Sequence, residues 1–164
     1  MDRKEILECY ERQKDRVYKF ACFTCKNVTM AEDVFQDVFY KYMLKQPRFK
    51  DDDHETAWFI RVTINACRDV LKSKWNKARL ELEEWDGKED PMNEPEEWEI
   101  LRDAVKNLPE KYRAVIYLYY YEEYSTKEIA EILRRRETTV RTQLQRGREQ
   151  LKEILEERRK SHGR

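Results

Sequence analysis

The chain has 164 residues, 41% of them charged, with 34 basic and 34 acidic side chains but only three glycines and four prolines. This composition predicts an all-α protein and excludes a glycine-rich phosphate-binding loop. Because no apolar run is long enough to cross a bilayer, we expect a cytoplasmic protein without direct membrane insertion.

The first helical run, around Phe20, contains two of the four cysteines. Cys22 and Cys25 form a single Cys-x-x-Cys pair with no second pair and no nearby His, so the four ligands of a structural zinc site are missing. We expect all four, including Cys9 and Cys67, to pack as small hydrophobes in a reducing compartment, with a redox or metal role as the alternative. The sequence predicts no metal and no cofactor.

A second helix is predicted from about Met30 to Lys45, opened by a capping box of Thr29 and Glu32. One side is apolar and expected to be buried: Val34, Phe35, Val38, Phe39 and Tyr42. The other side is polar and carries one aromatic ring, which suits protein docking, although acidic residues here also suit the helix dipole alone. This docking strip consists of Asp33, Gln36, Asp37 and Tyr40.

A third helix is predicted over residues 57–77, with a buried stripe and a basic face. The stripe consists of Ile60, Ile64, Cys67, Val70 and Leu71. The basic face consists of Trp58, Arg61, Asn65, Arg68, Lys72 and Trp75. Cations neutralise phosphates and aromatic rings stack on unpaired bases, so this face is typical of single-stranded nucleic-acid binding. Trp58 fits a core position equally well.

The charge is unevenly distributed along the chain. Residues 1–78 hold 16 basic and 13 acidic side chains, residues 79–99 hold 2 and 10, and residues 100–164 hold 16 and 11. The acidic stretch contains Gly87, Pro91 and Pro95. We therefore predict two small helical domains, 1–78 and 98–164, joined by an acidic linker over 79–97.

The second domain contains a helix-turn-helix pattern. Ser125 and Glu128 make a capping box, a break of three arginines follows, and apolar residues resume at Val140 and Leu144 with Gly147 on the same side as a close-approach position. Opposite them lie four polar residues whose lengths suit base edges in the major groove. These predicted readers are Arg141, Thr142, Gln145 and Arg146. A helical hairpin with a solvated basic face is the alternative.

Motifs in both predicted domains resemble those of one known protein family. The run from Ala31 to Phe39 and the run from Ala57 to Asn65 are similar to the second conserved region of bacterial sigma factors. The run from Leu108 to Arg113, followed by Ser125 to Leu133, is similar to the fourth. Order and spacing resemble the extracytoplasmic-function group, and the resemblance covers nearly the whole chain.

The resemblance implies a role for each surface. The docking strip would bind core RNA polymerase, and residues 47–55 would capture a base flipped from the minus-ten element of promoter DNA. Positions on the third helix would melt and read that element: Trp58, Arg61, Asn65, Arg68 and Lys72. The predicted readers would bind the minus-thirty-five element. An anti-sigma factor is a further implied partner, and no catalytic residue is expected, so the protein would not be an enzyme.

Two departures from the family pattern stand out. The capture loop is acidic at Asp51, Asp52 and Asp53, which either contact DNA or cap the following helix. Arg134 and Arg135 replace the Gly and apolar residue usual in the turn, which predicts a looser or shifted turn. The main alternative function is a stand-alone helix-turn-helix regulator whose first domain binds a partner.

Overall fold

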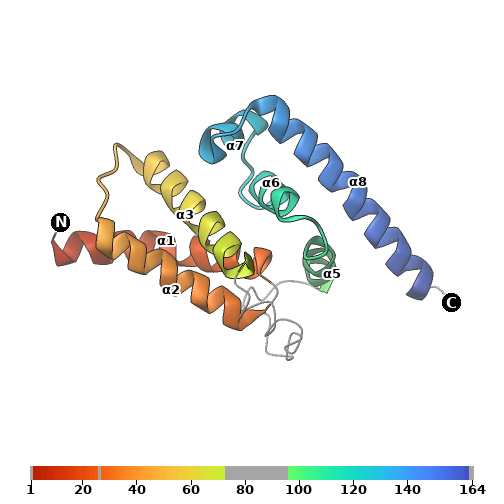
Figure 1. Ribbon diagram of the computed structural model, residues 1–164, viewed down its shortest axis with the longest axis horizontal. Coiled ribbons are helices and arrows are strands. Elements are labelled where there is room, and N and C mark those ends of the chain that lie inside the picture. Colours follow the sequence, from red (N-terminus) through yellow and green to blue (C-terminus); the bar gives the residue numbers. More distant parts are fainter. Residues whose placement is uncertain (1, 26, 73–95, 163–164) are drawn as a thin grey trace. The chain divides into compact units, whose positions relative to one another are not determined.

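The computed structural model describes residues 2–25, 27–72 and 96–162, in which every regular element is a helix (Figure 1). The chain divides into two compact units, Met1–Met92 and Asn93–Arg164. The all-α prediction with two helical parts is confirmed. Of the predicted linker 79–97, residues 79–95 lie outside the described residues, and 96 and 97 begin helix α5. No helix among the described residues is long and apolar enough to span a membrane.

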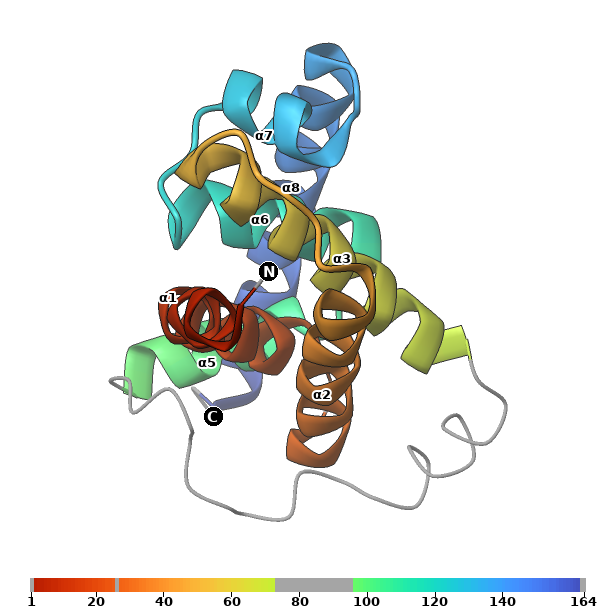
Figure 2. The same ribbon diagram turned by 90° about the vertical axis from the view of Figure 1, so that its left-hand side faces the viewer.

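The first unit consists of three mutually packed helices, which Figure 2 shows with α1 viewed almost end-on. They are α1 (Arg3–Thr24), α2 (Val28–Lys45) and α3 (Asp52–Lys72). Phe20, Val34 and Phe59 from the three helices are at most 2% exposed. The Tyr10 ring of α1 meets the Phe39 ring of α2 edge-on, with centroids 5.0 Å apart. Burial of apolar and aromatic surface therefore holds this unit together.

Helix α2 begins earlier than the sequence predicts. Its N-cap is Asn27, whose side-chain oxygen accepts a hydrogen bond of 2.8 Å from the backbone N–H of Met30. The predicted capping box of Thr29 and Glu32 is therefore wrong, since Thr29 already lies in the first turn. Asn is at least as strong an N-cap as Thr, and here it stands directly before the first helical residue, Val28.

Helix α3 also begins earlier than predicted, at Asp52 rather than Ala57. Asp51 caps it: its carboxylate accepts a hydrogen bond of 2.8 Å from the backbone N–H of His54. Three further acidic residues, Asp52, Asp53 and Glu55, occupy the first turn, where the helix dipole favours them. Residues 73–77 of the predicted helix, including Trp75, lie outside the described residues.

All four cysteines are buried in the first unit and none forms a disulfide. Cys25 and Cys67 have their sulfur atoms 3.8 Å apart, a contact between thiols rather than a bond. Burial raises the pKa of the Cys9 thiol. The prediction that the cysteines pack in the core is confirmed.

In the second unit, three helices pack against one long helix. They are α5 (Glu96–Val105), α6 (Glu110–Tyr120) and α7 (Thr126–Leu133), packed on α8 (Glu137–His162). Val140 and Leu144 are buried as predicted, at 0% and 3% exposure. A Cβ added to Gly147 would lie 2.8 Å from Ile116 Cδ1 and 3.2 Å from Tyr112 Cβ. Gly147 is thus the predicted close-approach position between α8 and α6.

Candidate nucleic-acid interface

The predicted helix-turn-helix forms as expected. Ser125 accepts a hydrogen bond of 3.1 Å from the N–H of Glu128, and the Glu128 carboxylate accepts one of 3.1 Å from the N–H of Ser125. Three residues separate α7 from α8. This reciprocal cap fixes where α7 starts and so where the turn before α8 falls.

The prediction of a shifted turn is wrong: the turn falls at residues 134–136 and keeps the backbone geometry that glycine usually provides, although an arginine occupies it. Arg134 ends α7 in the left-handed region, with φ 56° and ψ 45°. The next residue, Arg135, donates a hydrogen bond of 2.9 Å from its guanidinium to the Gln143 side chain of α8. The second arginine therefore ties the turn to α8 where an apolar residue would have packed.

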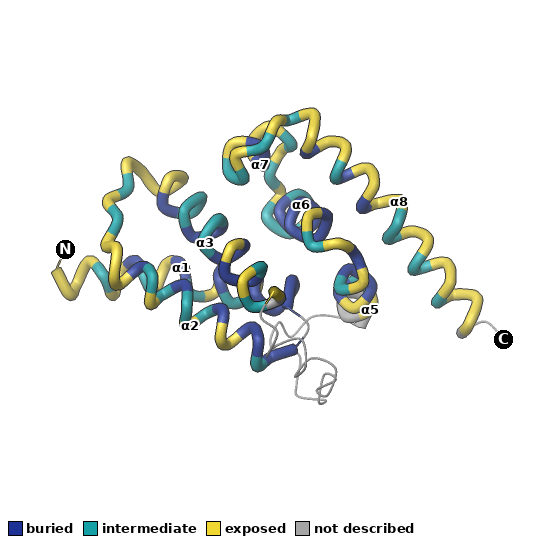
Figure 3. The backbone as a smooth tube through the Cα atoms, viewed as in Figure 1, coloured by how far each residue is buried: buried dark blue, intermediate teal, exposed yellow. Residues whose placement is uncertain are grey.

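The four predicted readers lie together on one exposed face of α8. They are Arg141, Thr142, Gln145 and Arg146. In Figure 3 the exposed colour alternates with buried and intermediate segments along this helix, as expected for a helix packed on one side only. The face projects hydrogen-bond donors that suit base edges.

The four predicted readers differ in the hydrogen bonds and ion pairs that their side chains make. The Arg141 guanidinium lies 2.7 Å from the Glu137 carboxylate, and the Thr142 hydroxyl donates to the Thr138 carbonyl at 2.9 Å. Gln145 donates a longer hydrogen bond of 3.4 Å to Glu149. Arg146 makes no hydrogen bond or ion pair with any residue that the structure describes. The contacts that are made are local ones within α8.

A hollow of about 350 Å³ adjoins this face, between the first turn of α6 and the first three turns of α8. Its lining comprises Lys111, Tyr112, Thr138, Thr139, Thr142, Gln143 and Arg146. Sequence reasoning missed Lys111, because only the packing of α6 on α8 brings it beside the readers, and it missed Thr138 and Thr139, which lie on α8 one turn before the readers. Their ammonium and hydroxyl groups suit contacts to phosphate oxygens.

The predicted basic face of α3 is only partly exposed. Asn65 and Lys72 are exposed, whereas Trp58, Arg61 and Arg68 are half-buried. The buried side also differs from the predicted stripe: Phe59, Thr63 and Ala66 join it at no more than 1% exposure, whereas Val70 is only half-buried.

Trp58 belongs to an aromatic cluster rather than standing alone on the helix surface. Its ring centroid lies 5.8 Å from that of Phe49 in the preceding loop, 6.1 Å from Tyr42 and 4.9 Å from Phe59. Because Trp58 is half-buried, part of its ring is packed and part faces solvent. Both interpretations of this residue, core and surface, therefore describe part of its environment.

A partly buried polar network joins α1 to the first turn of α3, just after the loop. Glu55, with a side chain 8% exposed, accepts two hydrogen bonds from the Arg12 guanidinium, at 3.0 and 2.9 Å, and one of 3.0 Å from Gln13. Burial alone would raise the pKa of Glu55, but these hydrogen bonds outweigh it and hold that pKa below its usual range. The network joins α1 to the first turn of α3 and so fixes where the loop ends.

The docking strip on α2 is exposed along most of its length. Asp33 and Gln36 are exposed, Asp37 is half-buried with its carboxylate 3.0 Å from the Lys41 ammonium, and Tyr40 is 64% exposed. Met43 and Leu44 in the next turn are also largely exposed, an apolar extension that sequence reasoning missed.

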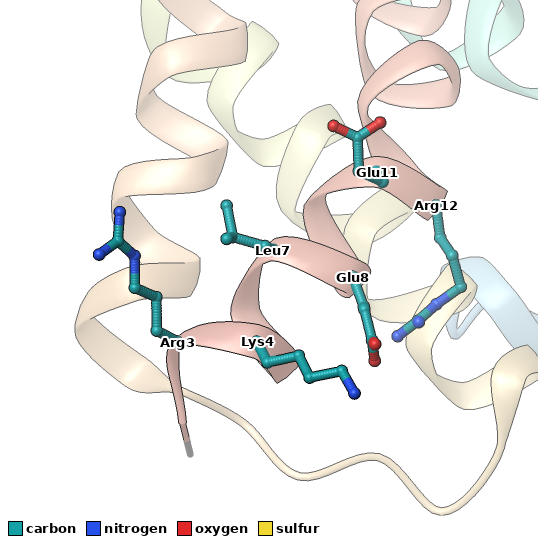
Figure 4. Close-up of a pocket in the computed structure, with 6 residues that line it drawn as sticks. All are labelled: Arg3, Lys4, Leu7, Glu8, Glu11 and Arg12. Carbon is teal, nitrogen blue, oxygen red and sulfur yellow. The ribbon is translucent and has the colours of Figure 1, made fainter.

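A separate hollow of about 640 Å³ lies on the first turns of α1 (Figure 4). The six side chains that line it are Arg3, Lys4, Leu7, Glu8, Glu11 and Arg12. None of the predicted site residues is among them.

Comparison with known proteins matches both parts of the chain to one family. The family model for sigma-70 region 2 matches residues 9–77, and that for sigma-70 region 4 matches residues 98–151. The ECF RNA polymerase sigma factor SigW of Bacillus subtilis (strain 168) is 29% identical, with 94% of this chain and 90% of the relative covered. The RNA polymerase sigma factor SigZ of the same organism is 31% identical, with 78% and 74% covered.

A solved structure has the same fold. The sigma factor RpoE from Bartonella quintana, crystallised with the anti-sigma factor NepR, aligns with a TM-score of 0.76 at 19% identity, over 93% of this chain and 98% of that one. The fold, the two matched regions and the relatives agree, and the chain belongs to the sigma-70 family, in its extracytoplasmic-function (ECF) group.

Proposed function

We propose that this protein is an RNA polymerase sigma factor, which binds core RNA polymerase and directs it to promoter DNA to initiate transcription. The observation that carries the proposal is the pairing of two family regions in one chain, residues 9–77 and 98–151, with an exposed polar reading face in the second. A stand-alone regulator is not favoured, since region 2 accounts for the first unit. The protein would act in the bacterial cytoplasm, where its partner enzyme works.

We assign a role to each surface. The predicted readers on α8 would donate to base edges of the minus-thirty-five element, and Lys111 would add a phosphate contact beside them. The face of α3 would hold the melted minus-ten strand, through stacking on Trp58 and through charge on Arg61, Arg68 and Lys72. Asn65 on the same face would hydrogen-bond to a base.

The docking strip would recruit the polymerase. Asp33, Gln36 and Asp37 are polar groups and Tyr40 is an exposed aromatic, a combination common in protein interfaces. Each of the two units would bind DNA weakly alone, and docking on the polymerase would raise the effective concentration of each at its promoter element. The protein itself would make and break no covalent bond.

We also propose an anti-sigma factor as a partner. RpoE of Bartonella quintana, which shares the fold, was crystallised with one. A partner that covers the docking strip or the α8 face would keep the protein from the polymerase or from DNA.

The test is transcription in vitro with purified core RNA polymerase on a library of random promoter sequences. With the protein added, we expect transcripts to start downstream of a shared pair of spaced sequence elements. Core enzyme alone should show no such enrichment. The proposal fails if the protein leaves the start sites unchanged, and specific binding to a duplex without polymerase would instead indicate a stand-alone regulator.

A further inference from the structure

Glu137, the first residue of α8, joins a predicted reader to the preceding helix. Its Oε1 atom accepts a hydrogen bond of 2.7 Å from the Arg141 guanidinium and another of 3.2 Å from the Thr126 hydroxyl of α7. The carboxylate is therefore held from two sides, once along α8 and once across the turn. A guanidinium bonded to it takes up the geometry that the carboxylate sets.

The second arginine of the reading face has no such support. Arg146 makes no hydrogen bond or ion pair with the residues that the structure describes, although it lies only five positions further along α8. Arg141 is thus oriented by the protein before DNA arrives, whereas Arg146 has to be ordered by the DNA itself. Ordering a long side chain on binding costs conformational entropy, and a preoriented side chain avoids part of that cost.

The Glu137–Arg141 pair contributes little to the stability of the free protein. The two side chains are 36% and 65% exposed, and ion pairs of this kind are weakened by water and salt. Against a duplex the situation changes, because water leaves the interface and a charge-assisted hydrogen bond strengthens as the local dielectric falls. Since Arg141 uses one terminal nitrogen for Glu137, its other donors stay free to reach a base edge.

The charge of Glu137 acts in the opposite direction on affinity. A carboxylate close to DNA repels every phosphate, whatever the sequence, so it weakens binding to cognate and non-cognate duplexes alike. The hydrogen bond to Arg141, by contrast, favours only sequences whose base edge Arg141 can contact in the orientation that Glu137 sets. A residue with both effects lowers the affinity for all DNA but raises the difference in binding free energy between the cognate sequence and the others. That difference is the selectivity of the protein.

We propose that Glu137 is a positioning residue for promoter selection: it orients Arg141 toward one base of the upstream element, while its charge weakens binding to all sequences alike. This inference rests on the proposed function of the α8 face. It adds to that function a residue which would not itself read a base.

The experiment uses the full chain with core RNA polymerase and a promoter library randomised in the upstream element. Four variants are compared with the natural protein: Glu137→Gln, Arg141→Ala, the double variant, and Glu153→Gln. The last makes the same chemical change at an exposed position of the same helix, beyond the predicted readers, and serves as the matched control. Filter binding of each holoenzyme to non-cognate duplex over a salt series, and thermal unfolding of each free chain, complete the set.

For Glu137→Gln we expect discrimination at the base read by Arg141 to fall about fivefold or more, with the other positions unchanged. Binding to non-cognate DNA should rise about two- to threefold at low salt, and the thermal midpoint should stay the same. Arg141→Ala should reduce the base preference at the same position. The double variant should reduce that preference no further than Arg141→Ala does alone. Glu153→Gln should leave all base preferences unchanged.

Two outcomes would overturn the inference while leaving the proposed function intact. In one, the natural protein selects an upstream sequence and Glu137→Gln selects it equally well. In the other, Glu137→Gln weakens selection at every position, or weakens it together with the thermal midpoint. If the natural holoenzyme selects no upstream sequence at all, the role assigned to the α8 face fails first.

Discussion

The two surfaces predicted to contact nucleic acid differ in how they are supported. On α3 a polar network and an aromatic cluster pack around the predicted residues, whereas on α8 the predicted residues project from an exposed helix face. The first turn of α3 is tied to α1 by the hydrogen bonds of Glu55 with Arg12 and Gln13, and Trp58 packs within an aromatic cluster. On α8 the readers make side-chain contacts with residues four positions away, or none among the described residues. The first surface is built in advance, whereas on the second Glu137 holds Arg141 and the Arg146 side chain is left to adjust to its ligand.

This difference suits the two tasks proposed for them. A melted strand is flexible, so a rigid surface with a fixed ring and fixed charges can impose an order on it. A duplex is already ordered, so the side chains that read it can adjust while the helix as a whole is held in place. If so, substitutions in the first unit should change stability and function together, and substitutions on α8 should change function alone.

The largest effect is expected from Arg12→Met. This change leaves the Glu55 carboxylate buried without its main partner, which should cost about 2–3 kcal/mol of unfolding free energy. Chemical denaturation measures it. The matched control is Lys14→Met, which removes an exposed ion pair with Glu11 of the same helix and should leave stability unchanged. Equal stability of both variants would show that the network does not hold the loop.

Trp58→Ala should combine a stability loss with a functional one. Removing a half-buried ring from the cluster should cost about 1–3 kcal/mol, less than for a fully buried Trp. Promoter melting, followed by permanganate reactivity of unpaired thymines, should be impaired while polymerase binding is retained. Trp58→Phe, which keeps an aromatic ring, should recover part of both. Normal melting by the alanine variant would remove Trp58 from the proposed strand-holding face.

Arg146→Ala should affect function alone. Its guanidinium has no partner among the described residues, so stability should change little, whereas binding to the cognate upstream element should weaken by about 1–3 kcal/mol. Selection from a randomised element should relax at one base position. A uniform loss over all sequences, with a smaller salt dependence, would instead make Arg146 a phosphate contact.

The smallest effect expected is the pH dependence that Glu55 adds to the first unit. Its pKa is lowered in the folded protein from an unfolded value near 4.5. The resulting stabilisation is present above that unfolded value and is lost as the pH falls through the folded pKa. Denaturation at pH 7 and at about pH 3 should show a larger stability loss for the natural protein than for Glu55→Gln. An equal acid sensitivity of both would mean that other carboxylates dominate.

Local patterns in the sequence were sufficient to predict the second unit's key features. The reciprocal cap of Ser125 and Glu128, the break after α7 and the exposed position of the four readers all depend on residues three or four apart. Helix geometry alone relates such residues, since each turn places them side by side. The burial of Val140 and Leu144 followed from the same periodicity.

Tertiary structure decided two things that the sequence patterns did not. It selected which of several candidate residues caps each helix, and it determined which residues of different helices meet. Asn27 and Asp51 begin α2 and α3 earlier than the sequence patterns indicated, because packing and chain path select among several residues able to cap. Glu55 meets Arg12 across 43 positions of sequence, and Lys111 lies beside the readers only because α6 packs on α8. Periodicity says which side of a helix is buried, but which neighbour covers that side depends on the packing of whole helices.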